Sequence, residues 1–136
     1  DFQATLAVME RVAYDSAFMF KYSERPDTPA SRLVDDVPET VKDARLQQLI
    51  RRQEELWLAR AAAMVGEEWM IAIEGPDVKG RGFLRGRTLN NRKVLVPQRP
   101  GVGLGDELLV RITGIDGTTF SGEPVALTWK YQRVAA

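Results

Sequence analysis

The beginning of the chain shows two hydrophobic periods in succession. Apolar residues recur at intervals of three and four from Phe2 to Ala13, which predicts a helix of about a dozen residues with Asp1 as its N-cap. Residues 16–22 follow with apolar side chains on both alternating faces, the pattern of a strand that is covered on both sides, as in parallel α/β sheets. Because a single strand cannot form a sheet, we expect this helix and strand to be the remnant of an α/β sheet or barrel whose other strands lie outside this chain.

Residues 23–30 form a loop, because Pro26 and Pro29 cannot continue a strand ladder. Loops at the carboxyl ends of strands face the ligand in α/β barrels and open sheets. Arg25 is therefore the catalytic candidate of this segment, since a guanidinium can hold a carboxylate or a phosphate. A plain surface loop is the alternative interpretation of the same residues.

A helical pattern runs from Pro38 to about Val65. Pro38 suits a first helical turn, Asp35 and Asp36 precede it near the positive end of the helix dipole, and Gly66 is placed to end the helix. The apolar stripe of this helix consists of Leu46, Leu49, Ile50, Trp57, Ala61 and Met64. Charged residues on the other face can pair at intervals of three and four, which favours a solvated face over a nucleic-acid site. A helix of this length is typical of a spacer between two unlike regions.

Beyond Gly66 the hydrophobic period changes to two, and turn residues divide the chain into short strands. The strands predicted in this way cover 69–73, 80–89, 93–96, 108–112 and 118–123. Asp116-Gly117 is a hairpin signal before the last strand. Five antiparallel strands within about sixty residues predict a small closed or nearly closed β-barrel of the OB kind.

The glycine-rich connection from Arg99 to Asp106 is interpreted as a turn, because it lacks the lysine and the strand-to-helix context of a phosphate-binding P-loop. The fold class that follows is α+β, with a barrel remnant, a long linker helix and an antiparallel OB-like β-barrel. The predicted domains are the remnant (1–37), the linker helix (38–66), the β-barrel (67–127) and a tail (128–136).

The amino-acid composition excludes several classes of catalytic and metal-binding site. The 136 residues are 44% apolar, which is enough for a core, and no apolar run approaches the ~18 residues of a membrane span. The chain has no cysteine and no histidine, so it offers no thiolate nucleophile, disulfide, imidazole acid or base, or zinc or iron–sulfur ligand of these types. Nineteen basic residues balance nineteen acidic ones, so electrostatic binding depends on a local patch.

The positive and negative charges of the chain balance overall, but residues 79–99 carry positive charges only. This stretch holds seven basic residues and no acidic one: Lys79, Arg81, Arg85, Arg87, Arg92, Lys93 and Arg99. On the second strand alternate positions share a face, which places Arg81, Phe83, Arg85 and Arg87 on one side and Gly80, Gly82 and Gly86 on the other. Arginine binds phosphate and stacks on bases, and an exposed ring adds a stacking surface. This favours binding of single-stranded or looped RNA.

The residues that we predict to bind RNA lie on the second strand, in the following turn and at the start of the third strand. They are Arg81, Phe83, Arg85, Arg87, Asn90, Asn91, Arg92 and Lys93. The alternative is that Phe83 belongs to the core and that the arginines only solubilise an edge strand.

Three motifs stand in the order known from one protein family. Residues 18–30 read Phe-Met-Phe-Lys-Tyr-Ser-Glu-Arg-Pro-Asp-Thr-Pro-Ala, Val37-Pro-Glu leads into the long helix, and residues 86–94 read Gly-Arg-Thr-Leu-Asn-Asn-Arg-Lys-Val. Together they resemble the last barrel strand with its loop, the linker, and the TRAM signature in the C-terminal part of MiaB-type radical-SAM methylthiotransferases. The resemblance covers nearly the whole chain.

The resemblance implies a parent enzyme that inserts a methylthio group into N6-isopentenyladenosine beside the tRNA anticodon. Its implied cofactors are two 4Fe-4S clusters and S-adenosylmethionine, and the cluster cysteines of such enzymes belong to preceding parts of the protein. We therefore expect neither cofactor nor catalytic activity in this chain alone. The implied partners are the tRNA anticodon stem-loop and the N-terminal and radical-SAM domains of the parent. A cytoplasmic location, without a membrane, is implied as well.

Asp27 departs from the family, which usually has glycine at this place in an Arg-Pro-Gly-Thr loop. If the position needs a positive φ, aspartate adopts it less readily than glycine, and this bears on the loop geometry near Arg25. Two other functions stay open, namely the substrate-binding module of a ribosomal-protein methylthiotransferase and a non-catalytic bracing module. The Asn90-Asn91 turn and its basic flanks favour RNA.

Overall fold

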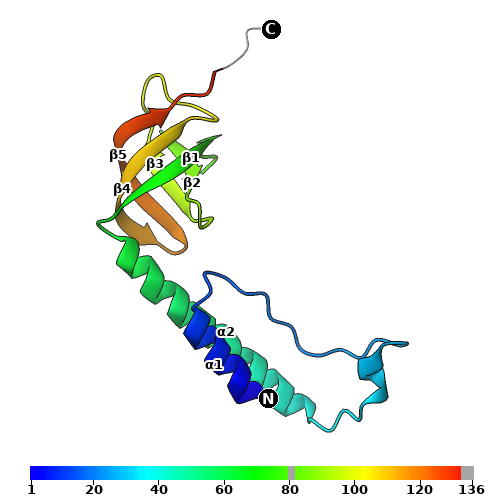
Figure 1. Ribbon diagram of the computed structural model, residues 1–136. Helices are drawn as coiled ribbons and strands as arrows, with labels where there is room; N and C mark the ends of the chain where they lie inside the picture. The colour runs from blue at the N-terminus through cyan, green and yellow to red at the C-terminus, as the bar shows by residue number, and fades with distance from the viewer. Residues whose placement is uncertain (80–81, 133–136) are drawn as a thin grey trace. The chain divides into compact units, whose positions relative to one another are not determined.

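Figure 1 shows the computed structural model of the chain, which describes residues 1–79 and 82–132. The chain falls into two compact units, residues 1–60 and the residues from 61 onward. The first unit is helical, and the described part of the second unit forms a five-stranded closed barrel. The predicted class of helices followed by a small β-barrel is therefore confirmed.

Helix α1 (Phe2–Val12) has the position that the sequence predicts. The Asp1 carboxylate accepts a hydrogen bond of 3.1 Å from the backbone N–H two residues on, which satisfies a free amide of the first turn. At the other end Ala13 adopts a φ of 51°, and its N–H donates to the Met9 carbonyl. Leu6 and Met9 are the buried residues of the helix.

Residues 16–22 do not form a strand, contrary to the prediction. Their burial does alternate, because Ala17 and Met19 are half-buried whereas Phe18 and Phe20 are exposed. A strand is held by backbone hydrogen bonds to a neighbour, and none of the described strands pairs with this segment. The structure therefore does not show the expected remnant of an α/β barrel.

Side chains connect this segment to helix α2 (Glu39–Met64). The Lys21 Nζ lies 2.9 Å from the Glu39 carboxylate and 3.0 Å from the Asp43 carboxylate. Hydrogen bonding to Glu39, followed by that to Asp43, raises the pKa of Lys21 above its ordinary value. Exposed ion pairs of this kind contribute little stability, so they do not equal the backbone ladder that the segment lacks.

Helix α2 begins directly after Pro38, and the φ of Gly66 just beyond its end is 90°. Glycine adopts this left-handed conformation without a steric cost, so it ends the helix as the sequence predicts. Ala61 and Met64 of the predicted apolar stripe are buried, and the other positions of the stripe are half-buried: Leu46, Leu49, Ile50 and Trp57. Within the described ranges, no helix combines the length and the apolarity needed to cross a membrane.

The strands of the second unit close into a barrel in the order β1-β2-β3-β5-β4, as predicted for a small OB-like fold. Their bounds are β1 (Glu68–Pro76), β2 (Phe83–Arg87), β3 (Lys93–Pro97), β4 (Glu107–Asp116) and β5 (Thr119–Trp129). The predicted hairpin joins β4 to β5. Gly117 has a φ of 59° in its turn, which a residue without a Cβ adopts readily.

The pairing of β3 with β5 corrects the prediction that all strands are antiparallel. These two strands are parallel, with Lys93 opposite Thr119, whereas the other four neighbouring pairs are antiparallel. Directions cannot alternate throughout a closed ring of five strands, because five is an odd number, and one parallel pair is therefore unavoidable. The glycine-rich connection from β3 to β4 contains turns and no helix, as expected.

Inward-facing side chains from the strands fill the barrel. The largest fully buried ones are Phe120, Ile71, Leu108, Ile112, Val94, Val96 and Val110. Gly86 lies on the same inner face, and a Cβ at this position would stand 2.8 Å from the Ile71 Cδ1 atom. The absence of a side chain at Gly86 thus makes room for Ile71, and the neighbouring residues of β2 point outward.

Candidate nucleic-acid interface

The outward face of β2 carries three of the residues that the sequence predicts for RNA binding. Leu84 and Gly86 are buried, whereas Phe83, Arg85 and Arg87 lie at the alternate, outward positions. Phe83 keeps 40% of its surface exposed, so the alternative that places it in the core is wrong. We call Phe83, Arg85 and Arg87 the β2 row.

Strand β3 widens the β2 row into a surface. The three residues of the row pair across the strands with Pro97, Leu95 and Lys93, in that order. Pro97 is exposed, and Leu95 and Lys93 are half-buried. Apolar and cationic side chains therefore lie next to one another on the same face, a combination that suits bases and phosphates together.

One carboxylate lies on this face as well. The Glu74 Oε1 atom is 3.3 Å from the Arg85 Nε atom and 3.2 Å from the Arg87 Nε atom. Glu74 reaches both arginines because the register of β1 shifts after Ile73, at a bulge that leaves Glu74 without a direct partner on β2. The three side chains keep 32–40% of their surface exposed. The arginines are thus ordered by a shared carboxylate and remain accessible.

The turn between β2 and β3 is held by its own hydrogen bonds. The Asn91 N–H donates to the Thr88 carbonyl at 2.9 Å, and the Thr88 N–H donates to the Arg92 carbonyl at 3.0 Å. Asn91 has a φ of 62°, a conformation that asparagine tolerates better than most residues. The Asn90 side chain accepts a hydrogen bond from the Thr88 hydroxyl and contacts the Met64 sulfur. Asn91 is therefore the more exposed of the two predicted asparagines.

The other predicted RNA-binding residues do not all reach this surface. Arg92 is 4% exposed, and its guanidinium carbon lies 5.8 Å from the centre of the Phe120 ring, so it packs against the barrel core. Lys93 lies on this surface and is half-buried. Its Nζ lies 3.3 Å from the carboxylate of Asp77, whose side chain is almost fully buried. Arg81 lies outside the described residues.

The catalytic candidate Arg25 lies in an exposed loop ahead of the short 3-10 helix η1 (Pro29–Arg32). The Thr28 hydroxyl donates to the Arg25 carbonyl at 2.8 Å and accepts from the Ser31 N–H at 3.3 Å. Asp27 has a φ of 65°, so this position uses the conformation in which glycine is least strained. Local hydrogen bonds hold the loop, and the Arg25 side chain faces solvent.

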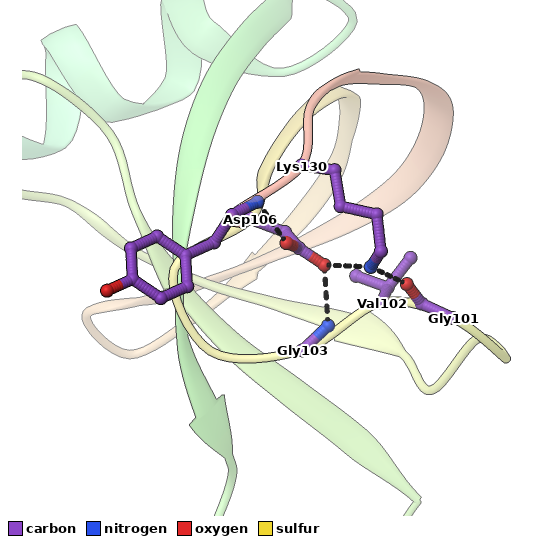
Figure 2. A pocket seen from close by; sticks show the side chains of 6 residues that line it. Gly101, Val102, Gly103, Asp106 and Lys130 are labelled. Carbon is purple, nitrogen blue, oxygen red and sulfur yellow. Dashed lines mark hydrogen bonds and ion pairs between the residues drawn. The ribbon is translucent and has the colours of Figure 1, made fainter. Parts of the chain in front are cut away.

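A buried aspartate that sequence analysis missed joins the glycine-rich connection to the segment after β5 (Figure 2). Asp106 is 2% exposed and accepts hydrogen bonds from the Gly103 N–H at 2.9 Å and the Tyr131 N–H at 2.8 Å. Lys130 Nζ lies 3.1 Å from the same carboxylate and also donates to the Gly101 carbonyl. The hydrogen bond from Gly103 is the largest cause that lowers the pKa of Asp106 below its ordinary value of 3.8. We call this arrangement the Asp106 clasp.

The ligand chemistry of the chain does not fit an iron–sulfur cluster. Such clusters are held mainly by thiolates and in some cases by imidazoles, and the sequence has neither cysteine nor histidine. In residues 1–79 and 82–132, no group of three or more acidic side chains is placed to hold a metal ion. The outward face of β2 and β3, with the turn between them, offers cationic, aromatic and amide groups instead, together with the Glu74 carboxylate.

Comparison with known proteins relates the chain to one group of enzymes, although no family model matches it. The chain is 45% identical to the tRNA-2-methylthio-N(6)-dimethylallyladenosine synthase of Chlorobium chlorochromatii (strain CaD3) over 129 residues, which are 94% of this chain and 28% of that protein. Synthases of the same name from Phocaeicola vulgatus and Porphyromonas gingivalis (strain W83) are 47% and 46% identical. Each of these two matches covers 92% of this chain and 27% of the relative.

The matches extend over both compact units, since they cover more than nine-tenths of the chain. The three relatives carry the same name, and that name agrees with the resemblance seen in the Arg-Pro-Asp-Thr loop and in the motif of residues 86–94. The chain spans less than a third of the length of these relatives. It belongs to the MiaB-type tRNA methylthiotransferase family and corresponds to a C-terminal part of its members.

Proposed function

We propose that the barrel of this chain binds tRNA through the β2 row and the adjoining residues of β3. The observation that carries this proposal is the alignment of the exposed Phe83 ring with the accessible guanidinium groups of Arg85 and Arg87. Guanidinium groups bind phosphate oxygens in a forked geometry, and an exposed ring stacks on an unpaired base. The Asn91 side chain at the nearby turn adds an amide that can both donate and accept at a base edge.

We infer that the RNA bound in this way is the anticodon stem-loop. The relatives are named as synthases of a modified adenosine in tRNA. In the whole protein, which we take to be cytoplasmic, the reaction is methylthiolation of N6-isopentenyladenosine beside the anticodon. S-adenosylmethionine and two 4Fe-4S clusters supply the chemistry of that reaction, and other parts of the protein bind them. The share of this chain is to hold the RNA, with residues 67–127 as the binding domain and residues 38–66 as the linker.

Binding of an anticodon stem-loop to the 136-residue chain tests this proposal. Fluorescence anisotropy of a labelled stem-loop at several salt concentrations gives the affinity and its salt dependence. If about three or four phosphates are contacted, affinity falls with salt at a log–log slope of roughly −2 to −4. Replacing both Arg85→Ala and Arg87→Ala should weaken binding and reduce the magnitude of the slope by about two, because each lost phosphate contact removes about one.

Arg111→Ala is the matched control for the loss of positive charge. Arg111 is an exposed residue of β4, which does not neighbour β2 or β3 in the barrel, and it pairs with Glu68 at 2.9 Å. This variant should keep the slope of the wild type. A double variant that is folded by circular dichroism and binds RNA with unchanged affinity would refute the proposed face and favour a bracing role.

A further inference from the structure

A cavity of about 640 Å³ lies at one end of β2 and β3. Leu84 of β2 lines it, as do Gln98 and Arg99, which directly follow β3. Phe83 is the neighbour of Leu84 in β2 and pairs with Pro97, the last residue of β3. The cavity therefore lies at the same end of β2 and β3 as Phe83, the first residue of the β2 row, although Phe83 is not among its lining residues. We call it the Gln98 cavity.

The walls of the Gln98 cavity combine apolar surface with one amide and one cation. Pro76, Leu84 and Leu104 supply apolar walls, and none of the described lining residues is acidic. The volume lies within the range of roughly 300–1,000 Å³ that is usual for small-molecule sites. The Gln98 amide can donate and accept a hydrogen bond, and the Arg99 guanidinium suits a phosphate. These groups match the base face, the base edge and the phosphate of a single nucleotide.

Backbone hydrogen bonds hold the lining of the Gln98 cavity in place before any ligand binds. The Gln98 N–H donates to the Gly82 carbonyl at 2.8 Å, and the Val102 N–H donates to the Arg99 carbonyl at 3.2 Å. The Asp106 clasp fixes the next residue of the lining, Gly103, by a hydrogen bond of 2.9 Å. A preformed site loses less conformational entropy when it binds a ligand.

We propose that the Gln98 cavity takes one unpaired nucleotide of the RNA whose backbone lies on the β2 row. Gln98 then hydrogen-bonds the base edge, and Arg99 binds the adjoining phosphate. The inference rests on the proposed function, because the nucleotide reaches the cavity as part of the RNA held by Arg85 and Arg87. An unpaired loop base is suitable, since its faces and its pairing edge are free to be bound.

The test uses stem-loops with 2-aminopurine at one loop position at a time, because the fluorescence of this base depends on whether it is stacked. We expect one position to change fluorescence when the wild-type chain binds. Leu104→Trp fills the cavity and should abolish that change. Leu58→Trp is the matched control, because Leu58 is similarly exposed, at 57% against 59% for Leu104, and lies on α2. It should leave the signal unchanged.

Gln98→Ala provides a second variant in case Leu104→Trp does not fold. It should weaken stem-loop binding about fivefold or more, as the loss of one base contact does, and reduce the signal at the same loop position. The cavity proposal is overturned, and the RNA-binding proposal stands, if the double arginine variant changes the salt slope while Leu104→Trp and Gln98→Ala leave every loop position unaffected. Both proposals fail if none of these variants alters binding.

Discussion

The Glu74 carboxylate accepts a hydrogen bond from the Arg87 guanidinium on the outward face of the barrel, with 3.2 Å between Oε1 and Nε. The same oxygen lies 3.3 Å from the Arg85 Nε atom. One acidic group therefore holds two cations side by side although their like charges repel. It also occupies donors that would bind phosphate, so in the proposed complex Glu74 would compete with RNA for the same two side chains.

Glu74→Gln should strengthen binding of the anticodon stem-loop. The substitution keeps the size of the side chain but removes its negative charge, and exposed pairs of this kind are worth up to about 1 kcal/mol. We expect affinity to rise about two- to fivefold at low salt, as measured by anisotropy. The free energy of unfolding should change by less than about 1 kcal/mol.

Glu68→Gln is the control for this change. Glu68 pairs with Arg111 at 2.9 Å on the β1–β4 side of the barrel, so its neutralisation should leave RNA affinity as it is. Weaker binding by Glu74→Gln would show that Glu74 positions the arginines for RNA instead of competing with it.

Arg92→Met should destabilise the barrel without changing the salt slope of RNA binding. Arg92 is 4% exposed and lies over the Phe120 ring, so its side chain contributes to packing and lies off the surface that we propose to bind RNA. Urea unfolding should show a loss of about 1–3 kcal/mol, as is usual when a buried polar contact is broken. A folded variant whose slope falls by about one would instead place Arg92 on a phosphate.

The β2 row could be predicted from the sequence because alternation along a strand is a local property. Phe83, Arg85 and Arg87 share a face in any strand that contains them. The position of Glu74 beside them depends on how β1 pairs with β2 and on the bulge after Ile73. Pairing register is a property of two strands, and the spacing of charges within one stretch of sequence does not contain it.

The burial of Arg92 and of Asp106 could not be predicted from local sequence patterns either. Arg92 stands in a basic run that indicates an exposed face, and only closure of the barrel brings it over Phe120. Asp106 lies just before a strand and after a glycine, which is a weak sign of a structural role. Its partner Lys130 is 24 residues further on. The prediction of a strand at residues 16–22 was wrong for a related reason, because alternation of side chains does not by itself supply a neighbouring strand to pair with.

Gly86→Ala should destabilise the barrel by about 1–3 kcal/mol, the usual cost of overpacking a core. A Cβ at Gly86 would lie 2.8 Å from the Ile71 Cδ1 atom and 3.1 Å from the Ala72 carbonyl oxygen. Ile71 is 1% exposed and has little room to move. Gly114→Ala is the control, because a Cβ there meets nothing within 4 Å. Equal unfolding midpoints of the two variants in urea would contradict this account.

The Asp106 clasp should make the stability of the barrel depend on pH below about 4. Its hydrogen bonds, chiefly the one from the Gly103 N–H, lower the pKa of Asp106 in the folded chain below the ordinary value of 3.8. A carboxyl whose pKa is lower in the folded state stabilises that state at pH values above its unfolded pKa. This contribution should disappear as pH falls from about 4 through the lowered pKa of the folded state.

Urea unfolding of the wild type and of Asp106→Asn across pH 3–7 isolates this contribution. An amide has one accepting oxygen where the carboxylate has two, so the variant loses one of the hydrogen bonds from the Gly103 and Tyr131 N–H groups. It should therefore be less stable at neutral pH. The difference between the two proteins should shrink below about pH 4, because protonation neutralises Asp106 in the wild type as the substitution does in the variant. A difference for Asp106→Asn that stays constant from pH 7 to pH 3 would mean that the negative charge of Asp106 does not stabilise the clasp.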